Sequence, residues 1–139
     1  MPPVTRWFIR TSLVCFIAAL LTGTLLAARG PLQLPAFFNT LTPLFFHLFM
    51  VGFVAQLIFG MVFWMFPKAS KEQPRGSERL AWLTYGCLNA GLLLRVLAEP
   101  VHPFAPQPIW GWLLVASAVL QWFAGALFVV NTWNRVKER

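Results

Sequence analysis

The chain has 139 residues, of which 58% are hydrophobic and only 11% charged, and its net charge is +7. A chain this short and apolar leaves no room for a soluble domain beside its apolar segments, and it is typical of a membrane protein. Most of its cationic side chains lie at or beyond the ends of the apolar segments. This placement indicates membrane topology and contact with anionic membrane lipids, and it argues against nucleic acid as a partner.

Four apolar segments are expected to cross the membrane, because a transmembrane helix needs about 20 such residues. They cover residues 7–28, 43–66, 80–98 and 109–133. Each is predicted to be helical, since the bilayer core offers no water to satisfy free backbone groups. The predicted fold is therefore an all-α membrane protein, a four-transmembrane-helix bundle that forms one domain over residues 1–139.

The first segment has a second interpretation as a signal peptide, because Arg6 and Arg10 precede an apolar stretch that ends in small residues. The stretch is long for a signal peptide, however, and Leu25 interrupts the small-x-small cleavage pattern before Ala28. We therefore expect the segment to stay in place as a membrane span.

The lysine and arginine positions predict the orientation, because short cationic loops stay in the cytoplasm. One end of the predicted bundle carries most of them, namely Arg6, Arg10, Lys68, Lys71, Arg75, Arg79, Arg135, Lys137 and Arg139. The opposite connections hold Arg29 and no lysine. We expect a multi-pass protein of a prokaryotic cytoplasmic (inner) membrane, with both termini in the cytoplasm.

The second segment carries a small-residue pattern for close helix packing, with Gly52, Gln56 and Gly60 at intervals of four. At about 100° per residue, His47 lies about 140° around the helix from Gly52 and on the far side from Gln56. We therefore expect two faces. One packs against a neighbouring helix, and the other presents His47 and Met50 to a ligand or to another subunit.

His47 follows Pro43 by four residues, which places it about 6 Å below the outer surface if the helix begins at that proline. The third segment runs the opposite way and brings Arg95 to a similar depth. A neutral imidazole can ligate a haem iron, and an arginine can pair with the propionates. The predicted cofactor-binding residues are His47, Arg95 and Met50, with His47 as the metal ligand. The alternative is structural, with hydrogen bonds across helices and Arg95 reaching the interface.

Other polar residues in the spans indicate packing roles. Asn89, Gln121 and Gly125 are expected to form interhelical hydrogen bonds and close contacts. The two cysteines, Cys15 and Cys87, fall inside different spans and match neither a disulfide framework nor a CxxC motif. No hydrolase, phosphate-loop or zinc motif is present in the sequence, so no enzyme class is predicted.

The second segment reads His47, four residues, Gly52, seven residues, Gly60, six residues, Pro67. This pattern resembles the histidine-bearing helix of the NnrS family, haem- and copper-containing membrane proteins linked to nitric-oxide metabolism. More distantly it resembles the second helix of haem–copper oxidase subunit I, especially the cbb3 type. There, a histidine near the outer surface ligates the low-spin haem.

The resemblance implies one third of a twelve-helix haem–copper oxidase subunit I core, so that a homotrimer would rebuild the whole. It implies a b-type haem on His47, with copper as a minor option helped by Met50 or by symmetry-related copies. The oxidase subunits carry several histidines and a cross-linked tyrosine, whereas this chain has His47, His102 and Tyr85. A complete oxygen-reducing site is therefore not expected, and His102, between two prolines, is expected to be an exposed loop residue.

The first functional hypothesis is an integral membrane haem protein for electron transfer or for binding a diatomic gas such as NO or O2, with a redox partner or a larger respiratory complex. The second is a cofactor-free accessory or assembly subunit that docks through its glycine face. The third is a small transporter or channel, which is disfavoured because few polar residues lie at the middle of the membrane.

Overall fold

The computed structural model describes residues 1–68, 74–105 and 107–136, and every regular element in those ranges is helical. The first, third and fourth long helices are α1 (Pro3–Ala28), α4 (Glu78–Val101) and α5 (Pro108–Thr132), the last followed by the short η3 (Trp133–Arg135). The second long helix is built in sections, which are η1 (Ala36–Thr40), α2 (Leu41–Phe46), η2 (His47–Ala55) and α3 (Gln56–Met65).

Four helical segments in the described residues are long and apolar enough to cross a membrane: Pro3–Ala28, Ala36–Met65, Glu78–Val101 and Pro108–Arg135. Only 11–28% of the most apolar window of each is buried within the chain, so most of this apolar surface is left for lipid or for other chains. The predicted all-α fold and its four spans are confirmed. The chain is a multi-pass membrane protein.

The helix ends differ from the predicted bounds where proline was taken as a boundary. The second span begins at Ala36 and not at Pro43, because Pro43 lies in the first turn of α2, where the backbone N–H has no helical partner in any case. The third span runs through Pro100 to Val101 and so places Glu99 inside the helix. Proline therefore marks the ends of these spans less sharply than the sequence pattern implied.

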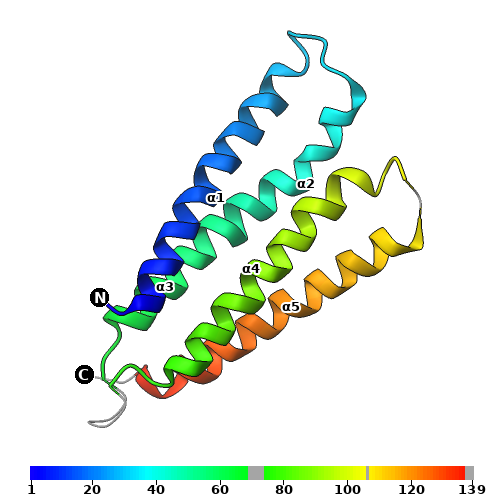
Figure 1. Ribbon diagram of the computed structural model, residues 1–139. Coiled ribbons are helices and arrows are strands. Elements are labelled where there is room, and N and C mark those ends of the chain that lie inside the picture. The colour runs from blue at the N-terminus through cyan, green and yellow to red at the C-terminus, as the bar shows by residue number, and fades with distance from the viewer. Residues whose placement is uncertain (69–73, 106, 137–139) are drawn as a thin grey trace.

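The four spans run alternately up and down and form two antiparallel pairs (Figure 1). α4 packs along α5, and α1 packs along η2 and α3. The two pairs meet mainly where α4 contacts α2, η2 and α1. The N-terminus of α1 and the start of α4 therefore lie at the same end of the bundle as η3, and His47 lies toward the opposite end.

The predicted packing face of the second span is confirmed. A Cβ atom added to Gly60 would lie 2.7 Å from Phe8 Cβ, and one added to Gly52 would lie 2.9 Å from Cys15 Cβ. The backbone of the second span therefore approaches α1 at distances that only glycine permits. Gly91 has the same function between α4 and α5, where Ser117 Oγ donates a hydrogen bond of 2.6 Å to its carbonyl oxygen.

The surroundings of Gly125 and Gln121 correct two expectations for α5. A Cβ atom on Gly125 would meet nothing within 4 Å, so the predicted close-packing role of Gly125 is wrong. Gln121 donates its amide hydrogen to Ser117 Oγ on its own helix, at 3.4 Å, although its stem does pack against Gly91. Small and polar residues in a span therefore predict helix contacts only where they face another helix.

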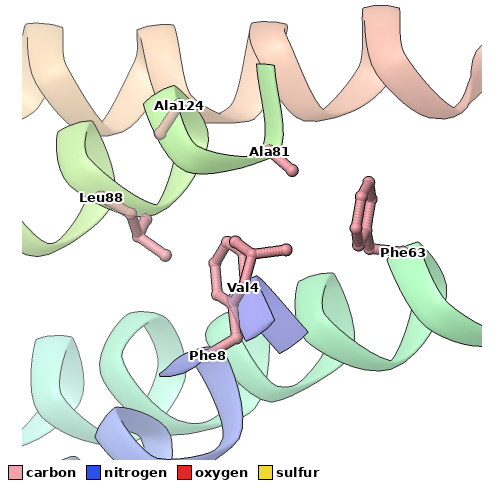
Figure 2. Packing of buried hydrophobic residues seen from close by; sticks show 6 residues of the cluster. All are labelled: Val4, Phe8, Phe63, Ala81, Leu88 and Ala124. Carbon is pink, nitrogen blue, oxygen red and sulfur yellow. The ribbon is translucent and has the colours of Figure 1, made fainter. Parts of the chain in front are cut away.

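Two apolar clusters fill the bundle. The first cluster, near the end that holds η3, joins all four long helices through Val4, Phe8, Phe63, Ala81, Leu88 and Ala124 (Figure 2). The second cluster lies toward the opposite end and contains Ala19, Leu41, Leu44, Leu48 and Leu92. Leu44 and Leu48 of this cluster flank His47 along the second span, so buried leucines hold that turn in place.

A polar contact joins three helices at Gln56. The side chain is fully buried, and its amide nitrogen donates to Asn89 Oδ1 on α4 at 3.2 Å and to the Thr11 hydroxyl on α1. Asn89 in turn donates to the carbonyl oxygen of Tyr85 at 2.9 Å. The predicted interhelical role of Asn89 is confirmed, and Gln56 is bonded to both neighbours of its helix.

Arg135 closes the end of the bundle opposite His47. Its side chain is fully buried and donates to three backbone carbonyls, those of Phe66 (2.8 Å), Pro67 (3.1 Å) and Arg75 (3.1 Å). Its guanidinium carbon also lies 5.9 Å from the centroid of the Phe63 ring. One side chain thus attaches the end of α5 to the segments that leave α3 and enter α4.

Candidate functional site

His47 stands at the junction of an α-helix and a π-helix. α2 ends at Phe46, and residues His47–Ala55 form η2, a π-helix in which the backbone N–H of Gln56 reaches the carbonyl of Val51. π-helical segments are rare in proteins, and those that do occur often lie at functional sites. The winding matters here because each residue of a π-helix turns the chain through a smaller angle than a residue of an α-helix.

This winding corrects the expected placement of His47. The angle of about 140° between His47 and Gly52 assumed an α-helix throughout. In the structure, the imidazole contacts α4 of the same chain, where Nδ1 lies 3.0 Å from Glu99 Oε1. The angle of 140° therefore does not apply to this segment, and His47 contacts α4 of the same chain whereas Gly60 packs against α1.

Glu99 links the two residues that the sequence singled out. Its Oε1 accepts hydrogen bonds from His47 Nδ1 at 3.0 Å and from Arg95 Nη1 at 2.8 Å. Arg95 and Glu99 are four residues apart on α4, the spacing that sets side chains on one helix face. The Thr40 hydroxyl donates to the Pro100 carbonyl at 3.4 Å and so ties the start of the second span to the end of α4.

The three side chains are largely enclosed, with exposed fractions of 6% for Glu99, 19% for Arg95 and 26% for His47. The charges of Arg95 and Glu99 cancel, so a neutral His47 leaves the cluster uncharged, which suits an apolar setting. Two polar atoms, Arg95 Nε and Glu99 Oε2, are buried and have no hydrogen-bond partner among the described residues. Such atoms are uncommon in folded proteins and keep the capacity to form a further hydrogen bond.

The contacts of His47 determine which ring nitrogen carries the hydrogen. Nδ1 lies 2.9 Å from the carbonyl oxygen of Pro43 and 3.0 Å from Glu99 Oε1, and both partners are acceptors. The neutral imidazole therefore carries its hydrogen on Nδ1, and Nε2 keeps its lone pair. Nε2 has no hydrogen-bond partner in the described part of the chain. The ring is thus fixed at one nitrogen and free at the other.

The surroundings of His47 are aromatic and partly open. The rings of Phe45 and Phe49 stack with their centroids 6.1 Å apart, and Phe49 also approaches Phe16 of α1 at 6.4 Å. Phe46 and Met50 are 56% and 53% exposed. The cluster therefore has a packed side toward α1 and a side on the outer surface of the bundle.

The structure brings His47 and Arg95 together, but only through Glu99, which the sequence analysis did not assign to the site. The spacing of Arg95 and Glu99 was the signal that could have identified it. Met50 is exposed and takes no part in the hydrogen-bonded cluster. His102 is exposed just after α4, as predicted.

Within residues 1–68, 74–105 and 107–136, no group of three or more His, Cys, Asp and Glu side chains could hold a metal ion. Cys15 and Cys87 are free thiols, as the sequence indicated. The described residues therefore include an imidazole nitrogen of His47 without a hydrogen-bond partner, but no group of side chains that could hold a metal ion by itself.

Comparison with known proteins adds no family assignment: no family model, no curated protein and no solved structure matches the chain.

Proposed function

We propose that this chain is an integral membrane haem protein in which His47 Nε2 is an axial ligand of the iron. The observation that carries the proposal is the state of the His47 ring, whose Nδ1 is held by the Pro43 carbonyl and the Glu99 carboxylate while Nε2 has no partner among the described residues. Histidines that ligate metals have this arrangement, with the second ring nitrogen bonded to a carboxylate or a backbone carbonyl. When bound, haem supplies one-electron chemistry or diatomic-gas binding.

The donor set of the site fits a b-type haem. Arg95 Nε is a buried donor without a partner in the described ranges, and a propionate carboxylate is an acceptor that would satisfy it. The exposed Phe46 and Met50 beside His47 offer apolar contact to a flat macrocycle. Cys15 and Cys87 lie on different helices and form no haem-attachment motif, which favours a group bound without covalent links.

Arg95 is shared between two partners in this proposal, because Nη1 is already bonded to Glu99. In the proposal, Nε and the other N–H groups of the guanidinium that are not bonded to Glu99 therefore make the contact with the propionate. Copper needs several clustered imidazoles or thiolates. Copper stays a minor option, because symmetry-related copies of His47 would have to supply its further ligands.

A symmetric oligomer, with a homotrimer favoured, completes the proposed site. His47 is 26% exposed and lies beside the exposed Phe46 and Met50, so one chain supplies one wall and one ligand. A second copy or a larger respiratory complex would supply the other wall. In the proposed orientation, the end with Arg6, Arg10 and Arg79 faces the cytoplasm of a prokaryotic inner membrane, because short cationic flanks stay inside.

A haem titration of the purified, detergent-solubilised protein tests the proposal. His47→Ala should weaken haem binding at least about 100-fold, because the iron loses its protein ligand, whereas His102→Ala should bind like the wild type. Equal affinity of wild type and His47→Ala would exclude His47 as the ligand. If the wild type does not bind haem at all, a cofactor-free accessory or assembly subunit becomes the better account.

A further inference from the structure

The Glu99 carboxylate is shared between a residue of its own helix and a residue of the second span. Arg95 reaches Oε1 from one turn earlier on α4, and His47 reaches the same oxygen from the start of η2. Glu99 is buried, so water screens its charge little, and Oε2 has no partner among the described residues. A change of charge on this oxygen therefore changes the electrostatic energy of the imidazole strongly.

We infer that Glu99 is a positioning residue for His47: it holds the hydrogen on Nδ1, and together with Arg95 it sets how strongly Nε2 donates electrons to a metal. The part that concerns the metal rests on the proposed haem function. The part that concerns the hydrogen on Nδ1 holds for the protein without haem. The Pro43 carbonyl also accepts the Nδ1 hydrogen. It is a neutral acceptor, however, and polarises the ring less than the Glu99 carboxylate does.

The two charged neighbours of the ring act in opposite directions. A carboxylate that accepts the Nδ1 hydrogen increases the basicity of the ring and strengthens Nε2 as a ligand. Arg95 withdraws charge from the same oxygen and weakens that effect. Ferric iron carries one more positive charge than ferrous iron, so it gains more from the negative charge of Glu99. Glu99 should therefore lower the reduction potential of a haem on His47, and Arg95 should raise it.

Nitrogen-15 NMR of the haem-free protein tests the placement of the hydrogen. The chain has two histidines, so labelling histidine and comparing with His102→Ala assigns the His47 ring. The wild type should show a hydrogen on Nδ1 and a bare Nε2. Glu99→Gln should shift the Nδ1 resonance, because the charged acceptor becomes neutral. A wild-type ring with its hydrogen on Nε2, or a Nδ1 resonance that Glu99→Gln leaves unmoved, overturns the inference.

Potentiometric titration of the haem-loaded protein tests the electronic part. Glu99→Gln should favour the ferrous form about tenfold, a rise of about 59 mV for one electron, and Arg95→Gln should shift the potential the opposite way. Glu99→Asp, which keeps the charge, should stay closer to the wild type than Glu99→Gln. The double variant Glu99→Gln/Arg95→Gln should return toward the wild-type potential, because the net charge of the cluster is restored.

The outcomes separate the inference from the function on which it rests. Shifts of the same sign for both single variants, or no shift, would reduce Glu99 to a structural contact while leaving His47 as the ligand. A wild type that binds no haem overturns the proposed function and the tuning with it, whereas the NMR result still decides whether Glu99 positions the ring. The double variant keeps the test valid if Arg95→Gln alone fails to fold around an unpaired carboxylate.

Discussion

Replacing Gly60 by leucine should separate α1 from the second span and lower the free energy of unfolding by about 3 kcal/mol or more. The reason is steric. Even a Cβ atom at Gly60 would lie 2.7 Å from Phe8 Cβ, which is fixed to the backbone of α1 and cannot rotate away. Gly60→Ala should already cost about 1–3 kcal/mol, the usual range for overpacking. Unfolding of the detergent-solubilised protein, followed by circular dichroism, measures both.

Gly125 provides the matched control for Gly60. Both are glycines inside a predicted membrane span, but a Cβ atom on Gly125 meets nothing within 4 Å. Gly125→Ala and Gly125→Leu should therefore leave the stability within about 0.5 kcal/mol of the wild type. Equal losses at Gly60 and Gly125 would mean that the close approach of α1 to the second span does not decide the stability, because helix propensity favours both substitutions.

Removing the Arg135 side chain should lower the free energy of unfolding by about 3 kcal/mol. Arg135→Ala leaves the carbonyl oxygens of Phe66, Pro67 and Arg75 without their donor. A hydrogen bond to a charged group contributes about 1.5–3 kcal/mol, but the loss should stay below the sum of three because the cation no longer has to be buried. Arg135→Lys should recover part of it, since a single ammonium cannot reach three carbonyls in a fixed fork.

Asn134→Ala is the control for Arg135, because Asn134 is the preceding residue and is exposed. It should change the free energy of unfolding by less than about 0.5 kcal/mol. Limited proteolysis of the segment between α3 and α4 gives a second readout, and cleavage should accelerate in Arg135→Ala alone. If Arg135→Ala unfolds like the wild type, the hydrogen bonds of this side chain are replaced by water without loss.

The fold was predictable because the bilayer restricts what the chain can do. Long apolar segments have to be helical, and their number follows from length and hydropathy, so the four spans were found, although the second begins at Ala36 and not at Pro43. The face with Gly52 and Gly60 was also predictable, since small residues at intervals of four allow close approach. Gly125 shows the limit of such patterns, because a glycine only matters for packing when a second helix lies opposite.

The candidate site was predictable in part. His47 and Arg95 stood out as ionisable residues at similar depth on antiparallel spans, and they do belong to one cluster. The π-helix from His47 to Ala55 could not be anticipated, because its sequence is apolar and fits an α-helix equally well. That segment changes the angle between His47 and the glycine face, and the contact of His47 with Glu99 does not follow from the sequence spacing.

Arg135 illustrates a different reason for a missed role. In the sequence it is one of several basic residues at one end of the predicted bundle, where each contributes equally to the orientation signal. Only the fold shows that its guanidinium lies among three carbonyls of segments about 60–70 residues away along the chain. Charge counting treats it like Arg6 or Arg10, which are exposed.

The most direct test of a haem on His47 is a visible absorption spectrum of the purified protein, recorded oxidised and then reduced, beside the His47→Ala variant. We predict a Soret band that sharpens on reduction in the wild type and is absent from the variant. A wild-type protein without this band, even after expression with added haem, or a variant that retains it unchanged, would contradict the account.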